Sequence, residues 1–189
     1  MTWHSRWRTA SLVALAALTA ACSPVLNWRE VPLEGMVALL PCKPDHAERR
    51  VQLGSSSVML QMSGCEAGGA LYAISHVRVT DGAEREPTKA AWRRATVDTL
   101  QVSAVVQTQT LRLAKPTAGQ TRATAKPGDG AADTAFNVEK LQGKRPDGTA
   151  VQAQLTWLIK GPDIYHVAVY GTKLDEDMSE LLFSGLRLQ

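Results

Sequence analysis

The chain has 189 residues, of which 44% are hydrophobic and 21% charged, a composition typical of one globular domain and not of a disordered or fibrous chain. Its 14 glycines and 9 prolines are too few for a collagen-like or low-complexity polymer. The formal net charge of +3 and the three cysteines need an explanation. A basic excess can indicate an anionic partner, and an odd cysteine can indicate a free reactive thiol.

The N-terminal residues have the order of an export signal. Arg6 and Arg8 are the only charged side chains before Cys22, and they precede an apolar run over residues 12–18 and a stretch of small residues. The apolar run is shorter than the roughly 20 residues that a membrane-spanning helix needs. An uncleaved anchor and an ordinary secretion signal are the alternatives.

The segment Leu18-Thr19-Ala20-Ala21-Cys22 resembles the lipobox of bacterial lipoproteins, although Leu18 lies one residue further from the cysteine than is usual. The resemblance implies that the signal peptide, residues 1–21, is removed and that Cys22 receives a diacylglycerol. A further acyl chain such as palmitate then joins the new amino group, and several chains together hold a protein stably on a membrane. By the sorting rule of that family, Ser23 implies the outer membrane, with the domain facing the periplasm.

Removal of the signal peptide changes the charge. Residues 1–21 carry two basic and no acidic side chains, so 19 basic and 18 acidic residues remain and the net charge falls to +1. A nucleic-acid binder is expected to carry a clear basic excess. We therefore expect no nucleic-acid partner, and we interpret the pairs Arg49-Arg50 and Arg93-Arg94 as solvated surface.

Lipidation of Cys22 leaves Cys42 and Cys65 as an even pair in an oxidising compartment, where a disulfide is expected. The alternative is a zinc site formed by Cys42, His46 and Cys65, with one open position. The spacing of these three residues is a weak signal, so the disulfide is the prediction and no metal site is assigned.

Residues 22–34 are polar and bounded by prolines, and we expect a short tether followed by one domain over residues 35–189. Strand-like segments separated by glycine- and serine-rich turns then predict an antiparallel meander: residues 36–40, 50–53, 58–62 and 70–79. The predicted disulfide would join one edge of this sheet.

In the main helix Pro87 can occupy the first position, and residues 89 to about 104 are good helix formers with an approximate apolar stripe that includes Trp92 and Leu100. Residues 108–113 are expected to be extended. The segment 114–133 contains Ala, Thr, Gly, Pro and Lys with almost no large apolar residue, which predicts a flexible loop.

Three further strands are predicted at residues 135–141, 151–159 and 164–170. Alternating apolar and polar residues in the second of them indicate one core-facing side. The acidic residues 175–177 open a helix that ends before Gly185, and residues 186–188 close the chain in an extended form.

The predicted fold class is therefore α+β, an antiparallel sheet of about six to seven strands with one main helix and a short C-terminal helix packed on it. The order of elements resembles the PsbP-like α/β fold, on the opening residues 38–44, the strand containing Tyr165, the acidic helix with Phe183, and residues 186–188. Proteins with that fold tend toward binding and assembly roles, and a fold alone does not give a function.

Complete catalytic motifs are missing from the sequence. Residues 128–133 lack the third glycine of a dinucleotide fingerprint, and residues 54–58 lack the closing glycine of a nucleophile elbow. His76 and His166 fall inside predicted strands, where an exposed or hydrogen-bonded sheet residue is the simpler interpretation. Residues 175–177 lack the spaced ligands of a calcium loop, so helix capping explains them.

These patterns predict a lipid-anchored envelope protein that acts as a non-catalytic binding or interaction module, without a cofactor. Its expected partners are the membrane, through the N-terminal lipid, and an envelope protein. The alternative is an envelope enzyme whose site is assembled from distant residues around His76 or His166, because a general base needs only a partner within hydrogen-bond reach.

Overall fold

The computed structural model describes residues 26–113 and 134–189. The predicted flexible loop at 114–133 and the signal peptide lie outside the described residues. The elements follow in this order: β1 (Arg29–Leu33), β2 (Met36–Leu40), β3 (Asp45–Leu53), β4 (Ser56–Ala67), β5 (Ala70–Arg78), the 3-10 turn η1 (Gly82–Glu84), α1 (Arg85–Thr99), β6 (Ala104–Arg112), β7 (Ala135–Lys144), β8 (Ala150–Lys160), β9 (Asp163–Gly171), α2 (Glu176–Ser184) and β10 (Arg187–Leu188).

Two antiparallel sheets form the framework. Seven strands pair in the order β3-β4-β5-β9-β8-β7-β6, and a smaller sheet has the order β1-β2-β10. The predicted α+β class, the strand number, the main helix and the short C-terminal helix are confirmed. The separate small sheet is new relative to the sequence analysis, which placed residues 36–40 in the same sheet as the other strands.

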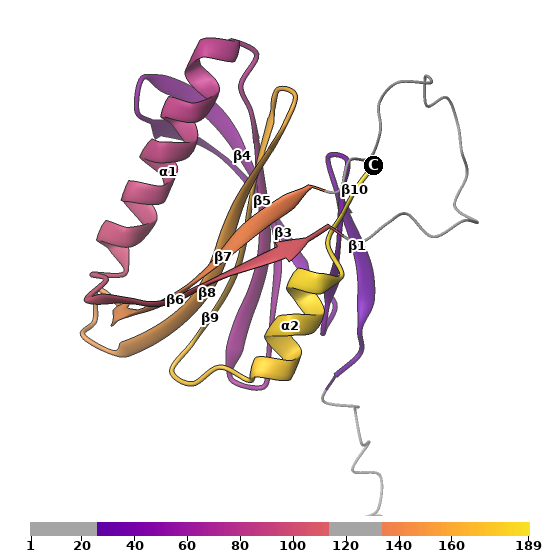
Figure 1. Ribbon diagram of the computed structural model, residues 1–189, viewed down its shortest axis with the longest axis vertical. Helices are drawn as coiled ribbons and strands as arrows, with labels where there is room; N and C mark the ends of the chain where they lie inside the picture. Colours follow the sequence, from indigo (N-terminus) through magenta and orange to yellow (C-terminus); the bar gives the residue numbers. More distant parts are fainter. Residues whose placement is uncertain (1–25, 114–133) are drawn as a thin grey trace, which may run out of the picture.

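The elements form three layers (Figure 1). Helix α1 covers one face of the seven-stranded sheet, while α2 and the small sheet cover the other. Trp92 and Ile164 belong to the core beneath α1, and Phe183 and Tyr72 belong to the core on the opposite face. The central strands are therefore buried on both faces, as expected for a sheet between two layers.

This layering corrects the prediction for β8. Alternation in residues 151–159 indicated one core face and one polar face, but Gln154, Thr156 and Leu158 on the expected polar side are buried as well. Leu158 packs in the core under the small sheet. The polar side chains of this pattern do not face solvent, because the small sheet and α2 cover this side of β8.

The folded region begins earlier than expected. Residues 29–33 were expected to belong to the tether but form β1, in which Val31 is buried and pairs with Ala38 of β2. Just before β1, the Asn27 backbone N–H donates to the Pro41 carbonyl at 2.7 Å. Pro32 is compatible with this strand because β1 lies at the edge of the small sheet.

Strands β3 and β4 are longer than the sequence predicts. β3 starts at Asp45 instead of residue 50, and its charged residues are exposed because β3 is an edge strand paired only with β4. Such a strand has little apolar periodicity. Charged residues on an edge also disfavour pairing with another chain.

Helix α1 starts at Arg85, two residues before the predicted first position at Pro87, and ends at Thr99, five residues before the predicted end at about 104. Pro87 occupies the third position of the helix, still in the first turn, where its missing N–H costs no hydrogen bond. The helix ends because Gln101 adopts a positive φ of 42°. At this end β7 passes so close that a Cβ on Gly143 would lie 2.2 Å from the Leu100 carbonyl oxygen. None of the helices in the described part of the chain has the length and apolar character needed to cross a membrane.

Candidate functional site

A cavity of about 470 Å³ lies between α1 and the face of the seven-stranded sheet that α1 covers. Small-molecule sites typically measure roughly 300–1,000 Å³ and combine apolar walls with a few polar groups. Its apolar lining comes from strands β3, β4 and β5 and from the helix and its C-terminal end, and includes Leu53, Leu60, Met62, Leu71, Trp92 and Leu100.

The cavity exists because small side chains face each other across it. On α1, Ala95, Thr96 and Thr99 line the cavity together with Trp92, at the spacing that places residues on one helix face; Ala95 and Thr99 are exposed at its open side. On the sheet, Ser75 of β5 lies in the same lining. Since large side chains at these positions would fill the gap, the space is a property of the sequence.

The charged residues of the lining are both arginines. Arg49 comes from β3 and Arg145 from the turn between β7 and β8, and the lining includes no carboxylate. Arg49 has no ion pair or hydrogen bond from its side chain within the described residues. Arg145 lies near Asp147, whose pKa is lowered chiefly by hydrogen bonds from Thr149 and also by the charge of Arg145.

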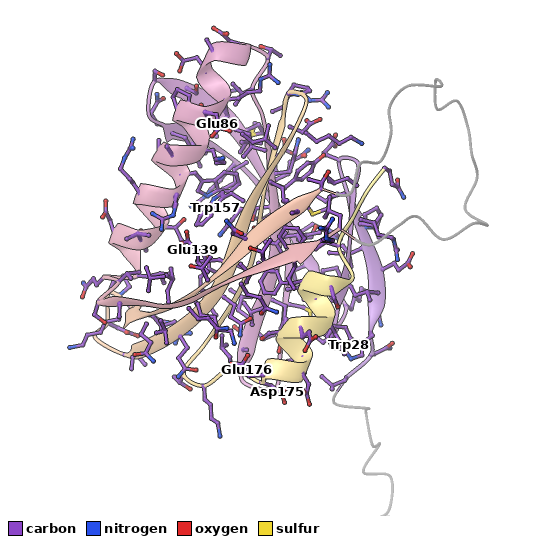
Figure 2. All side chains as sticks on the ribbon, in the orientation of Figure 1. Trp28, Glu86, Glu139, Trp157, Asp175 and Glu176 are labelled. Carbon is purple, nitrogen blue, oxygen red and sulfur yellow. A yellow bond between two sulfur atoms is a disulfide. The ribbon has the colours of Figure 1, made fainter. Side chains whose placement is uncertain are left out.

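His166 lies on the sheet side of the cavity, between two tryptophans. Its ring centroid is 5.4 Å from that of Trp92 on α1 and 4.6 Å from that of Trp157, with which it stacks. Figure 2 shows Trp157 on the face of the sheet toward α1. The side chain is buried, with 7% of the residue exposed, and burial lowers the pKa of the imidazole to about 3.

His166 is therefore a neutral imidazole near pH 7. Among the described residues, its Nε2 atom has no hydrogen-bond partner. Buried polar groups without partners are rare and destabilising, so each one calls for an explanation. The register pairs His166 of β9 with Ser75 of β5, so both polar side chains project toward the cavity from neighbouring strands.

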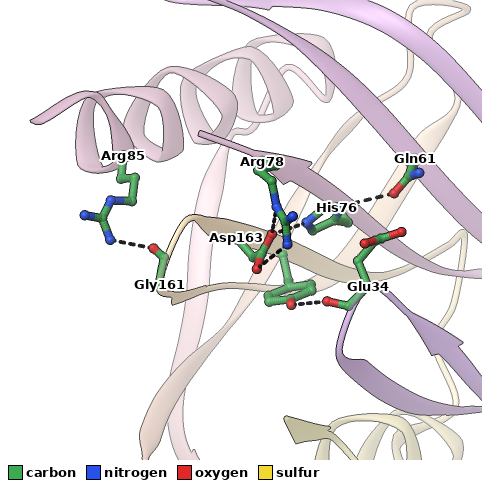
Figure 3. Close-up of polar contacts among 8 residues, drawn as sticks. Glu34, Gln61, His76, Arg78, Arg85, Gly161 and Asp163 are labelled. Atoms are coloured by element: carbon green, nitrogen blue, oxygen red, sulfur yellow. Dashed lines mark hydrogen bonds and ion pairs between the residues drawn. The ribbon is translucent and has the colours of Figure 1, made fainter. Parts of the chain in front are cut away.

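His76 lies on the opposite face of the same sheet, in a hydrogen-bond network (Figure 3). Its Nε2–H donates to Asp163 Oδ1 at 2.8 Å, and its Nδ1 contacts the Gln61 side-chain amide at 3.2 Å. Arg78 holds the same carboxylate through two hydrogen bonds, of 2.8 and 3.1 Å. Burial raises the pKa of Asp163, but the hydrogen bonds from Arg78 and His76 outweigh it and lower this pKa below its ordinary value.

A neighbouring hydrogen bond connects the same face of the large sheet to the small sheet. The Tyr165 hydroxyl donates to the Glu34 carbonyl in the turn between β1 and β2, at 2.5 Å, and burial raises its pKa to about 12. His76 is 3% exposed and both of its ring nitrogens are engaged. His76 thus joins β4, β5 and β9 beneath the small sheet, a structural role.

Cys42 and Cys65 form the predicted disulfide, with Cα atoms 5.9 Å apart. It joins the segment after β2 to β4, and so connects the small sheet to the large one instead of closing one edge of a single sheet. The alternative zinc site loses both thiolates to this bond. His46 hydrogen-bonds to the Ser63 hydroxyl at 2.8 Å, and the described ranges contain no group of residues suited to a metal.

Some of the remaining residues singled out in the sequence lie in the described part of the structure and others lie outside it. The Asp175 carboxylate accepts a hydrogen bond from the Met178 backbone N–H at 3.1 Å, which confirms helix capping. Residues 54–58 lie at the turn between β3 and β4 and in β4 itself. The proposed lipidation site, Cys22, and residues 128–133 lie outside the described residues.

Sequence reasoning identified His166 as a residue of interest but missed the cavity. The small residues Ala95, Thr96 and Thr99 share one helix face, and this spacing was a detectable signal. The spacing alone does not predict a cavity, because a cavity also depends on which strands face that side of α1. Arg49 and Arg145 reach the site from segments almost 100 residues apart, so their proximity could not be predicted either.

Comparison with known proteins assigns no family. No protein-family model matches the chain. A search of curated proteins finds no significant match. Function must therefore be inferred from the cavity, its polar groups and the residues around Cys22.

Proposed function

We propose that the protein is an exported, lipid-anchored protein of the bacterial envelope, and that its domain binds a ligand in the cavity between α1 and the sheet without transforming it. The lipid attaches at Cys22, and the domain faces the periplasm from the outer membrane. The ligand or an envelope protein that delivers it is the functional partner.

The observation that carries the binding role is the cavity itself. It combines aliphatic walls with the guanidinium of Arg49, exposed at its margin, and with the ring of the buried His166. Apolar walls with a few polar groups are typical of sites that bind small molecules.

The N-terminal sequence supports the anchor. Six residues separate Cys22 from Arg29, where β1 begins. Fully extended, six residues reach roughly 20 Å. A lipid on Cys22 would therefore keep the domain close to the membrane surface, where it can exchange a ligand with lipids or with membrane proteins.

An envelope enzyme is the second candidate, favoured by the presence of Ser75 and His166 in the same cavity. A general base works best with a pKa near the working pH. Burial holds the pKa of His166 near 3, and the lining contributes no carboxylate to orient the ring. His76 has the aspartate partner, but it is buried in its network on the other face. Binding therefore ranks ahead of catalysis.

The cavity can be tested with a neutral fluorescent probe, Nile red, whose emission rises in apolar surroundings. The chain from residue 22 onward with Cys22→Ser retains every described residue and carries no lipid. Ala95→Leu places a larger side chain in the cavity, and leucine is a good helix former. The matched control is Ala90→Leu, on an exposed position of α1 outside the lining.

We expect wild type and Ala90→Leu to bind one equivalent of Nile red, and Ala95→Leu to bind about 10-fold more weakly, a difference of about 1.4 kcal/mol. Equal binding by Ala95→Leu and Ala90→Leu would contradict a ligand role for the cavity. Absence of binding to the wild type would contradict it as well. Recovery of a chemically altered probe would instead support the enzyme.

The anchor is tested in a bacterial host that receives labelled palmitate. The wild-type chain should incorporate label and fractionate with membranes, whereas Cys22→Ser should do neither. An unlabelled wild type, or a Cys22→Ser chain that still fractionates with membranes, would show that Cys22 does not anchor the protein through lipid.

A further inference from the structure

The charged residues around the cavity indicate which class of ligand it binds. We propose that the cavity binds a single-chain organic anion, with an acyl chain against the apolar walls and a carboxylate or phosphate headgroup near Arg49 or Arg145. This inference rests on the proposed binding function and adds the class of ligand.

The charge of the lining supports an anionic headgroup. Both of its charged residues, Arg49 and Arg145, are cationic. No residue of the cavity lining is acidic, so the two arginines of the lining face a site without a carboxylate. An anion at the margin of the cavity would supply the charge-assisted hydrogen bonds that guanidinium groups form most strongly.

The lining also supports a chain as the apolar part. Met62 and Leu71, on β4 and β5, belong to the lining and are 38% and 37% exposed, so the site offers accessible apolar surface. A chain lying on them would remove apolar surface from water and gain the corresponding hydrophobic free energy. The flexible thioether side chain of Met62 can adjust to chains of different shape.

The buried histidine contributes polarity without charge. Because burial keeps His166 neutral near pH 7, the positive potential of the site comes from the two arginines. Arg49 and Arg145 are accessible to solvent at the margin of the cavity, whereas aliphatic side chains line its interior. An amphiphile would thus bind with its headgroup at the margin and its chain inside, and a cationic headgroup would be repelled.

The test compares four probes with the same ten-carbon chain: decanoate, decyl phosphate, decanol and decylammonium. Each is titrated into the chain from residue 22 onward with Cys22→Ser, below the concentration at which the probe forms micelles. Binding is measured by calorimetry. We expect at least one of the two anions to bind about 10-fold more tightly than decanol and decylammonium. Comparison of the two anions distinguishes a carboxylate from a phosphate headgroup.

The arginines are tested with the double variant Arg49→Gln/Arg145→Gln. Its matched control is Arg50→Gln/Arg94→Gln, which removes the same net charge from exposed positions outside the lining. Only the first variant should lose the preference for the anion, and both should bind decanol as the wild type does. Circular dichroism and the unfolding midpoint establish that both variants are folded.

Three results would contradict the proposed ligand class. The first is that the anions bind no more tightly than decanol, and the second is that decylammonium binds most tightly. The third is that the two double variants reduce the preference for the anion equally. Failure of all four probes would overturn it too. If Nile red still binds in a manner sensitive to Ala95→Leu, the proposed binding function survives and only the ligand class is wrong.

Discussion

His76 and His166 lie on opposite faces of one sheet, and their surroundings give the two imidazoles different roles. The sequence predicted that each would be exposed or hydrogen-bonded. The hydrogen-bonded interpretation is confirmed for His76, which binds Asp163 and Gln61. It is wrong for His166, which is buried between two tryptophans and whose Nε2 has no partner in the described part of the chain.

Burial of His166 predicts a specific dependence of stability on pH. The folded protein keeps this imidazole neutral, with a pKa of about 3, whereas the unfolded chain takes up a proton near pH 6.5. Its contribution to stability is therefore complete above about pH 6.5 and is lost as the pH falls toward 3.

The variant His166→Phe retains a ring between Trp92 and Trp157 but cannot titrate. Between pH 6 and pH 4, the free energy of unfolding of the wild type should fall more steeply than that of His166→Phe, by up to about 1.4 kcal/mol per pH unit. Urea unfolding at several pH values measures both slopes. Identical slopes would mean that His166 is not buried as a neutral group.

Among the elements, the start of α2 was predicted correctly because helix capping is local. Asp175 and the helix that follows it are adjacent in sequence, and the Met178 N–H lies within reach of the carboxylate whatever the rest of the fold does. The end of α1 was mispredicted because no glycine marks it. Gln101 adopts the left-handed conformation there, and close packing against Gly143 determines where the helix ends.

The cap gives a direct prediction for α2. Asp175→Ala should lower the free energy of unfolding by about 1 kcal/mol, because the Met178 N–H loses its acceptor. Asp177→Ala, in the same first turn, is the matched control, since it removes a charge near the helix N-terminus without removing the cap. High salt screens the interaction of charges with the helix dipole. In urea unfolding at high salt, only Asp175→Ala should therefore have a lower free energy of unfolding than the wild type.

At the scale of the whole molecule, the sequence predicted the fold class but not the three layers. Strands β7, β8 and β9 were identified from alternation and turn residues, which are local signals. Residues 36–40 and 186–188 were predicted to be extended, but their pairing was not, because β10 contains two residues and pairs with β2 across nearly the whole described chain. The cavity likewise depends on which elements face each other, so the sequence could not reveal it.

The disulfide is the covalent link between the two sheets. Its cysteines are 23 residues apart, and in the chain-entropy model closing a loop of this size stabilises by about 3 kcal/mol. The double variant Cys42→Ala/Cys65→Ala should therefore lose about that much free energy of unfolding. A reductant should destabilise the wild type to a similar degree and leave the variant unchanged. If the reductant has no effect on the wild type, the bond does not contribute to stability.

The position of β2 in the small sheet also bears on the order in which the protein can fold. Its pairing with β1 closes a short hairpin, and this contact can form as soon as the first residues of the domain are available. Its other neighbour, β10, follows every other element in the sequence. Contacts between such distant segments form slowly, because the intervening chain must first be brought together. The hairpin can thus form before β10 pairs with β2, and the apolar residues Met36 and Leu40 then still lack their packing against the C-terminal residues Leu182, Phe183 and Leu186.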